Sequence, residues 1–162
     1  MFYCVNQYKL ISEENKIIDY LNSENFNFNN CVILEKDCGI AGGFAQSLNN
    51  IKISVESYFG DDIIIKAINP NDKPAILIFN DAYYSEWRCA INNNNSEIYR
   101  ANYLFKAVII PPGENTVRFY YSYSTVKIGF IIAGLTLILL IIYLSFFYFL
   151  KKMKYRNIHL RN

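Results

Sequence analysis

The chain has 162 residues, of which 52% are hydrophobic, 17% are aromatic and 19% are charged, with a formal net charge of +2. Residues 1–127 hold eleven Lys and Arg against fourteen Asp and Glu, so this part is mildly acidic. That balance argues against nucleic-acid binding, because no basic patch is available to neutralise phosphates. Abundant aromatic and β-branched residues favour a packed, strand-rich domain over disorder.

The distribution of histidine and cysteine excludes several kinds of catalytic site. The single histidine is His159, in the C-terminal tail, so the preceding domain has no Ser/His/Asp triad, no Cys/His pair and no histidine-containing zinc site. We predict no catalytic residue, no metal site and no cofactor. None of the four cysteines forms a CxxC pair. Cys31 and Cys38 either close a disulfide or are small buried hydrophobic residues, and we favour the second interpretation.

Residues 1–50 predict an α/β lead-in. Phe2–Leu10 has the composition of a strand, and Ser12 predicts the N-cap of a short helix because two glutamates follow it. Val32–Leu34 predicts a short apolar strand. The glycine-containing loop at 39–43 is typical of a linker, since it has neither a P-loop lysine nor a dinucleotide fingerprint. The apolar residues expected on one face of the helix are Ile17, Ile18 and Leu21.

Residues 51–125 predict an antiparallel β-sandwich, because short strands follow one another with regular turns between them. Ala75–Phe79 is apolar throughout, so we expect a central strand there. The Asn92–Asn95 run predicts a hairpin tip because asparagine tolerates left-handed backbone geometry, and Pro111–Gly113 predicts a second turn. In the first of these strands Ile51, Ile53 and Val55 alternate with polar residues, so we expect these three side chains on its buried face. The other strands are expected over Ile51–Val55, Ile63–Ile68, Trp87–Ile91, Ser96–Ala101, Phe105–Ile110 and Thr116–Tyr123.

Ile128–Leu150 is uncharged from end to end and predicts a single C-terminal transmembrane helix, residues 128–150. At about 1.5 Å per residue, this helix is longer than the roughly 30 Å hydrocarbon core of a bilayer. It is also apolar on every face, unlike the core helix of a small domain. Five basic residues lie in the tail, 151–162. The positive-inside rule therefore predicts a cytoplasmic tail and an extracytoplasmic N-terminal domain.

The N-terminal sequence MFYCVNQYKL does not have the basic region and apolar core of a signal peptide. A domain on the outer side of a membrane needs a segment that carries it across. We therefore expect the chain to be the C-terminal piece of a longer membrane protein, whose earlier helices export the domain. The competing interpretation, a tail-anchored protein with a cytosolic domain, is disfavoured by the basic tail.

Several motifs follow one another from Ile76 to the membrane helix: ILIFNDAYYSEW, then RCAINNNNSEIYRANYLFKAVIIPPGENTVRFYY, then KIGF. In order and spacing they resemble the C-terminal part of the bacterial YfhO-type membrane proteins. The earlier segment ISEENKIIDYLNSENFNFNNCVILEKD is similar to the helix that leads into this domain in the family. Ser85 and Glu86 stand where the family has Pro-Gly, and Lys106 stands where it has Arg. The matching residues are Tyr83, Tyr84, Trp87, Asn102, Phe105, Ala107, Val108, Pro111, Gly113 and Val117.

The resemblance implies a role in the bacterial cell envelope. YfhO-type proteins are similar to polytopic glycosyltransferases that use polyprenyl-phosphate sugars, and their catalytic acids lie in an early loop that this chain does not contain. The chain would then be a non-catalytic accessory portion at the cytoplasmic membrane, positioning acceptor glycan or bracing the membrane domain. Its expected partners are the lipid bilayer, other membrane helices of the same or an adjacent polypeptide, and cell-envelope glycan. The alternative is a stand-alone membrane-anchored carbohydrate- or protein-binding module.

The candidate substrate-binding residues are Tyr83, Tyr84, Trp87 and Asn102. In this interpretation the aromatic rings stack on sugar rings, and Asn102 supplies hydrogen bonds together with nearby charged residues, among them Asp81. The competing interpretation makes Trp87 and one of the tyrosines core residues of the sandwich, which is usual for aromatic residues in strands. We expect the core outcome for Trp87.

Overall fold

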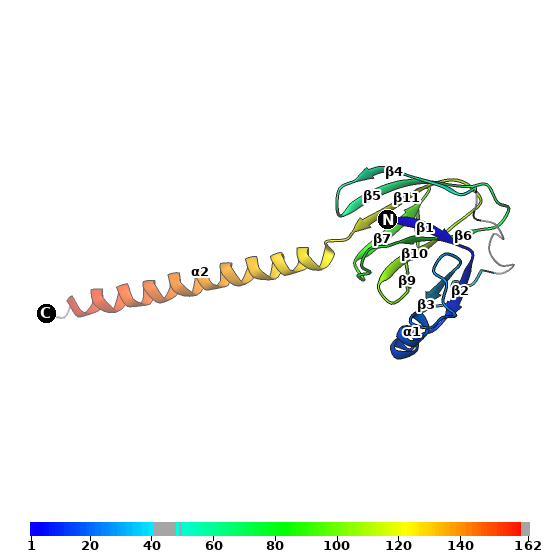
Figure 1. Cartoon of the computed structure of the whole chain (residues 1–162). Helices are drawn as coiled ribbons and strands as arrows, with labels where there is room; N and C mark the ends of the chain where they lie inside the picture. The colour runs from blue at the N-terminus through cyan, green and yellow to red at the C-terminus, as the bar shows by residue number, and fades with distance from the viewer. Residues whose placement is uncertain (41–47, 49, 160–162) are drawn as a thin grey trace. The chain divides into compact units, whose positions relative to one another are not determined.

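The computed structural model describes residues 1–40, 48 and 50–159, and the chain divides into two compact units, Met1–Ser122 and Tyr123–Asn162. The first unit is a mainly β domain and the second is a long helix (Figure 1). The domain is a sandwich of two sheets, a six-stranded sheet A and a five-stranded sheet B. The predicted fold class is therefore confirmed.

Sheet A has the strand order β1-β6-β10-β9-β3-β2. Its neighbours are antiparallel apart from β2 and β3, which run parallel. Strand β6 is central and buried along its whole length, as its unbroken apolar sequence predicts. The bounds of these strands are β1 Phe2–Val5, β2 Gln7–Leu10, β3 Cys31–Leu34, β6 Ala75–Phe79, β9 Tyr99–Ala101 and β10 Phe105–Ile110.

Sheet B is antiparallel throughout, with the strand order β4-β5-β11-β7-β8. Its longest strand, β11, pairs with β5 over eight residues and with β7 over five. This central position makes β11 the main support of the sheet. The bounds are β4 Lys52–Tyr58, β5 Asp62–Asn69, β7 Trp87–Ile91, β8 Asn94–Ser96 and β11 Gly113–Tyr121.

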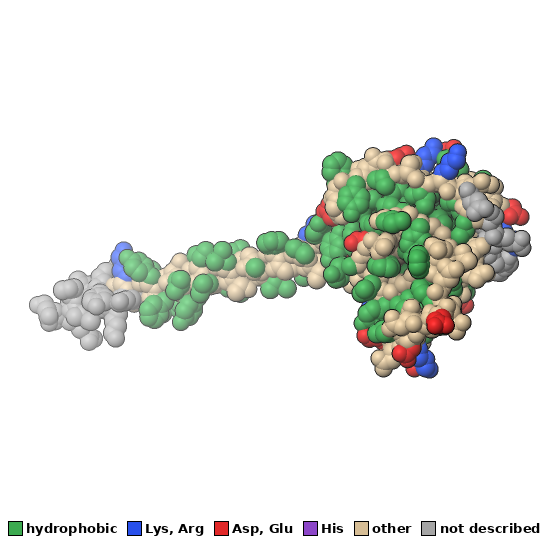
Figure 2. All heavy atoms as spheres, viewed as in Figure 1, with side chains coloured by type: hydrophobic (Ala, Val, Ile, Leu, Met, Phe, Trp, Pro, Cys, Tyr) green, Lys and Arg blue, Asp and Glu red, His purple; other side chains and the backbone are tan. Residues whose placement is uncertain are grey.

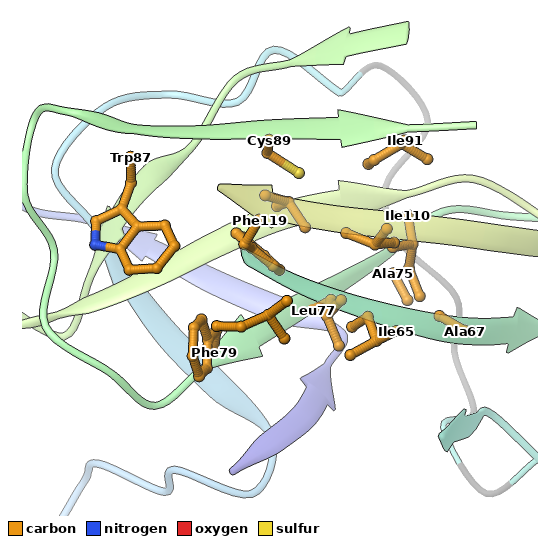
Figure 3. Close-up of a cluster of buried hydrophobic side chains, with 13 residues drawn as sticks. Ile65, Ala67, Ala75, Leu77, Phe79, Trp87, Cys89, Ile91, Ile110 and Phe119 are labelled. Carbon is orange, nitrogen blue, oxygen red and sulfur yellow. The ribbon is translucent and has the colours of Figure 1, made fainter. Parts of the chain in front are cut away.

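The main hydrophobic core fills the space between the two sheets (Figure 3). Alternate residues of β5, β6, β7, β10 and β11 point into it, because successive side chains of a strand lie on opposite faces. The rings of Phe79 and Phe119 pack with centroids 5.4 Å apart, and Trp87 meets Phe79 edge-on at 6.4 Å. Trp87 is 9% exposed, which confirms its expected place in the core.

A second cluster of buried residues lies on the opposite face of sheet A, around Val5, Ile76 and Ile78. Helix α1, Glu14–Leu21, lies near the β2–β3 side of this sheet (Figure 1), where the Lys9 ammonium sits 3.7 Å from the Tyr20 ring centroid. Ile17 is buried on α1. Sheet A is therefore apolar on both faces, whereas much of the outer face of sheet B is open.

The predicted α/β lead-in, residues 1–50, supplies α1 and three strands of sheet A. The expected strand over Phe2–Leu10 is divided into β1 and β2, which lie at opposite edges of that sheet. The predicted N-cap at Ser12 is wrong, because the cap position is Glu13, whose side chain makes no capping hydrogen bond. Gly42 and Gly43 lie outside the described residues.

The asparagine hairpin forms as predicted, with Asn92 and Asn93 at positive φ between β7 and β8. Positive φ at both central residues is the geometry of a tight two-residue turn. The strand predicted over Ser96–Ala101 is wrong, because the chain crosses from β8 in sheet B to β9 in sheet A. Likewise, the turn at Pro111–Gly113 carries the chain from β10 in sheet A to β11 in sheet B.

Strand β4 departs from the expected alternation. Its pairing with β5 shifts between Val55 and Ser57, as at a β-bulge, which re-aims the side chains on the bulged strand. Val55 is exposed, although the alternating pattern placed it on the buried face. Val55 pairs with Ile65 directly before the shift, on a strand at the edge of the sheet.

The second unit is helix α2, Ser124–His159. Its 27-residue stretch Ser124–Leu150 is long and apolar enough to cross a membrane, and none of its most apolar window is buried. Figure 2 shows hydrophobic side chains along this stretch. The helix extends beyond the predicted range 128–150 at both ends.

We predict that Trp87→Ala lowers the free energy of unfolding by about 3–5 kcal/mol, because it removes buried area and leaves a cavity between the sheets. The emission of the wild-type chain, which comes from this single tryptophan, should be blue-shifted and resistant to aqueous quenchers. Denaturant unfolding of the full chain in detergent micelles measures the first effect, with Tyr84→Ala on the exposed neighbour as control. Red-shifted, quenchable emission from the folded chain would contradict the core position.

Candidate ligand-binding cavity

A cavity of about 530 Å³ is lined by sheet A and by the segment that includes the end of α1 and the chain after it. Ligand pockets commonly have volumes of about 300–1,000 Å³, with mostly apolar walls and a few polar groups. Four aromatic rings and three asparagine amides line this one. Its lining residues are Met1, Tyr3, Cys4, Leu21, Phe26, Phe28, Asn29, Asn80, Asn102 and Phe105.

Asn102 is the only predicted binding residue that lines this cavity. It is buried at φ +47° and is held by the backbone of Ile33. The backbone N–H of Asn102 donates to the Ile33 carbonyl at 2.9 Å. The side-chain Oδ1 of Asn102 accepts from the Ile33 N–H at 2.8 Å. A side-chain hydrogen bond also joins it to the Tyr3 hydroxyl, whose pKa is raised by burial and lowered by this bond. These contacts fix both polar side chains in the cavity wall.

The structure does not assemble Tyr83, Tyr84 and Trp87 into a stacking platform. Tyr84 is exposed and Tyr83 is half-buried, whereas the indole of Trp87 lies in the core between the sheets. The Tyr121 ring meets the indole edge-on at 5.7 Å. The Tyr83 N–H donates to the Leu104 carbonyl at 2.7 Å, so the tyrosine loop does lie beside the loop that follows Asn102.

The Lys106 ammonium is a second polar feature and lies beside Trp87. The lysine side chain is fully buried, and its Nζ donates to Asp81 Oδ2 at 2.6 Å and to the Ala82 carbonyl at 2.9 Å. Nζ also sits 3.8 Å from the Trp87 ring centroid and 4.6 Å from that of Phe79. Burial lowers the pKa of Lys106, and the bond to Asp81 partly offsets this effect. Asp81 is therefore engaged in structure, not held ready for a sugar.

Cys31 and Cys38 are free thiols, as are Cys4 and Cys89. Burial raises the pKa of Cys4 to about 12 and that of Cys89 to about 12. A thiol with so high a pKa is almost entirely protonated at neutral pH, and the protonated form is not the nucleophile. These two cysteines therefore serve as small hydrophobic residues, whereas Cys31 and Cys38, for which burial was the favoured expectation, are half-buried.

The cavity can bind a ring with one apolar face and several hydroxyl groups. Aromatic faces suit the apolar side of such a ring, and amide groups both donate to and accept from hydroxyls. Sequence analysis did not identify Tyr3, Phe26, Phe28 or Phe105 as cavity residues. The only local signal was the alternation of phenylalanine and asparagine over 25–30, and the convergence with Tyr3 and Phe105 depends on packing.

Comparison with protein-family models, with curated proteins and with solved structures finds no match for this chain.

We predict that Asp81→Ala destabilises the domain by about 1–3 kcal/mol, because it leaves the buried Lys106 ammonium without a carboxylate that is itself partly exposed. Lys106→Met should cost less, since methionine fills similar volume and Asp81 remains partly hydrated. The double variant Asp81→Ala/Lys106→Met should recover stability relative to Asp81→Ala alone. Denaturant unfolding of the wild type, the two single variants and the double variant in micelles completes a double-mutant cycle. Additive losses in the double variant would contradict the coupling.

Proposed function

We propose that this chain is the membrane-anchored, non-catalytic accessory portion of an envelope glycosyltransferase of the YfhO-like kind that its sequence resembles. The domain lies outside the bacterial cytoplasmic membrane, the helix spans the bilayer, and the basic tail is cytoplasmic. The observation that carries the anchoring is α2, whose 27-residue apolar stretch follows a folded β domain.

The cavity gives this accessory role a binding site. Its combination of aromatic rings and amides matches the chemistry of an acceptor glycan, which the domain would hold while a separate catalytic part transfers the sugar. Asn29 and Asn80 offer side-chain amides in a wall that is otherwise mostly apolar. Asn102 is committed to Ile33 and Tyr3, so its role is to support the wall.

The same cavity also favours the alternative function, a stand-alone membrane-anchored carbohydrate-binding module. The two functions differ in partners. An accessory portion copurifies with a polytopic membrane protein, encoded in the same reading frame or in an adjacent one, whereas a stand-alone module does not. Mild-detergent purification of the chain from its native membrane distinguishes them.

We predict that Leu139→Arg weakens membrane insertion, because a charge near the bilayer centre costs about 2.5–3.5 kcal/mol on insertion scales. Leu139→Arg with Ile142→Arg should release the chain on carbonate extraction. Glu114→Arg, an exposed residue of the domain, adds the same side chain outside the helix and should leave insertion unchanged. Full retention of the doubly charged variant in the membrane fraction would refute the anchoring.

Glycan binding has its own test. We predict that Phe105→Ala and Asn80→Ala each weaken binding of N-acetylglucosamine oligomers, because one removes a ring face and the other an amide. Isothermal titration of the full chain in micelles measures the change in Kd. Tyr84→Ala, which alters an exposed tyrosine outside the cavity lining, is the matched control. Equal affinities for all four proteins would argue against this cavity as the glycan site.

A further inference from the structure

Exposed apolar side chains gather at one end of the sandwich. The five residues that we call the apolar rim all lie at the end of the domain where β11 finishes. Phe59 is 77% exposed and Met1 is 83% exposed, and the others are exposed by more than half of their surface. The members of the apolar rim are Met1, Tyr58, Phe59, Tyr84 and Leu104.

Strand register places Tyr58 and Phe59 at this end of sheet B. Tyr58 pairs with Ile63, near the start of β5, and β5 runs antiparallel to β11, so that Asp62 opposes Tyr120. The Tyr121 N–H donates to the Asp61 carbonyl at 2.8 Å. The turn between β4 and β5 therefore lies where β11 ends (Figure 1).

Hydrogen bonds and ring contacts place the other three members at the same end. The Asn80 N–H donates to the Met1 carbonyl at 2.9 Å, directly after β6. The Tyr83 N–H bonds to the Leu104 carbonyl, which brings the loops of Tyr84 and Leu104 together. The Phe79–Trp87 ring contact joins this end of sheet A to the matching end of sheet B.

This end of the domain is also the one from which the chain continues into the apolar helix. Ser122 still donates its N–H to the Glu86 carbonyl at 2.9 Å, and α2 begins at Ser124. A peptide chain spans at most about 3.3–3.6 Å per residue. One residue, Tyr123, separates Ser122 from α2, so the chain leaves the domain at the end that carries the apolar rim and enters the helix directly.

We propose that the apolar rim rests in the headgroup region of the bilayer that α2 spans, so that the domain contacts lipid directly. This inference goes beyond glycan binding but rests on the proposed anchoring by α2. Aromatic side chains with a polar tip, such as Tyr58 and Tyr84, favour the membrane–water interface. Insertion of Phe59 removes its ring from water.

The charges at this end indicate which lipids are contacted. Asp62 pairs with Arg118 and Asp81 pairs with Lys106, and Asp61, Glu86 and Arg88 also lie at this end. Among the described residues of the domain at this end, basic side chains do not outnumber acidic ones, so no basic cluster is available there to attract anionic headgroups. The contact is therefore with zwitterionic phospholipid and is driven by burial of apolar surface, not by charge.

Tryptophan scanning in vesicles tests the contact. The full chain carrying Phe59→Trp is reconstituted into phosphatidylcholine vesicles with and without brominated acyl chains, and wild-type emission corrects for Trp87. We expect bromolipid to remove most of the added emission. Glu114→Trp, near the opposite end of β11, should lose little. Tyr84→Trp is the second reporter on the apolar rim, in case Phe59→Trp does not fold.

The results separate this inference from the proposed anchoring. Carbonate-resistant insertion together with unquenched tryptophan at positions 59 and 84 would overturn the lipid contact and leave the anchoring intact. Failure of insertion would reject both. Quenching that appears only with anionic phosphatidylglycerol would also overturn the proposal, because it would show electrostatic adsorption. Tyr58→Ser with Phe59→Ser should abolish quenching at Tyr84→Trp while insertion persists.

Discussion

The buried ammonium group of Lys106 constrains one whole end of this domain. A charge without solvent costs several kcal/mol unless it is paired and hydrogen-bonded. Its compensation comes from both sheets: Asp81 follows β6, the Trp87 ring comes from β7, and Lys106 itself is on β10. The loop 80–86 and the indole therefore have to occupy set positions for the core to close.

This constraint explains why Trp87 and Asp81 are not free to bind sugar. Trp87 is the face on which a buried cation rests, and Asp81 is the counter-ion of that cation. A cation over a desolvated indole face is among the stronger aromatic interactions. Of the three aromatic residues in this motif, Tyr84 is exposed, Tyr83 is half-buried and Trp87 is buried. The aromatic sequence motif at 83–87 is thus divided between a structural core residue and a surface loop.

Much of the fold could be predicted from the sequence because hydrophobic alternation and turn chemistry are local signals. The central strand β6, the Asn92–Asn93 turn and the apolar helix are of this kind. The sequence could not show that the chain changes sheets between β8 and β9, because a crossover depends on which sheet offers the next free edge. Nor could it show that Val55 is exposed, since the place of β4 at the edge of its sheet depends on how the strands pair.

The candidate cavity was less accessible to sequence analysis than the fold. Asn102 was identified through the family resemblance. Its structural role is to bond Ile33 through both its backbone and its side chain. Ile33 lies 69 positions earlier in the chain. The aromatic walls come from segments that are far apart in sequence. The hydrophobic periodicity of a sequence describes one helix or strand at a time. It therefore cannot predict that side chains from distant segments meet around one cavity.

The strands at the four sheet edges have a consequence for behaviour at high surface density. Unpaired edges can template pairing between chains, and proteins guard against this with short or irregular edge strands. In the described sheets β1 and β2 have four residues each, β8 has three, and the longer β4 carries the register shift at Val55. Under the proposed anchoring by α2, molecules in one membrane meet often. Edges of this kind let them crowd without joining into extended intermolecular sheets.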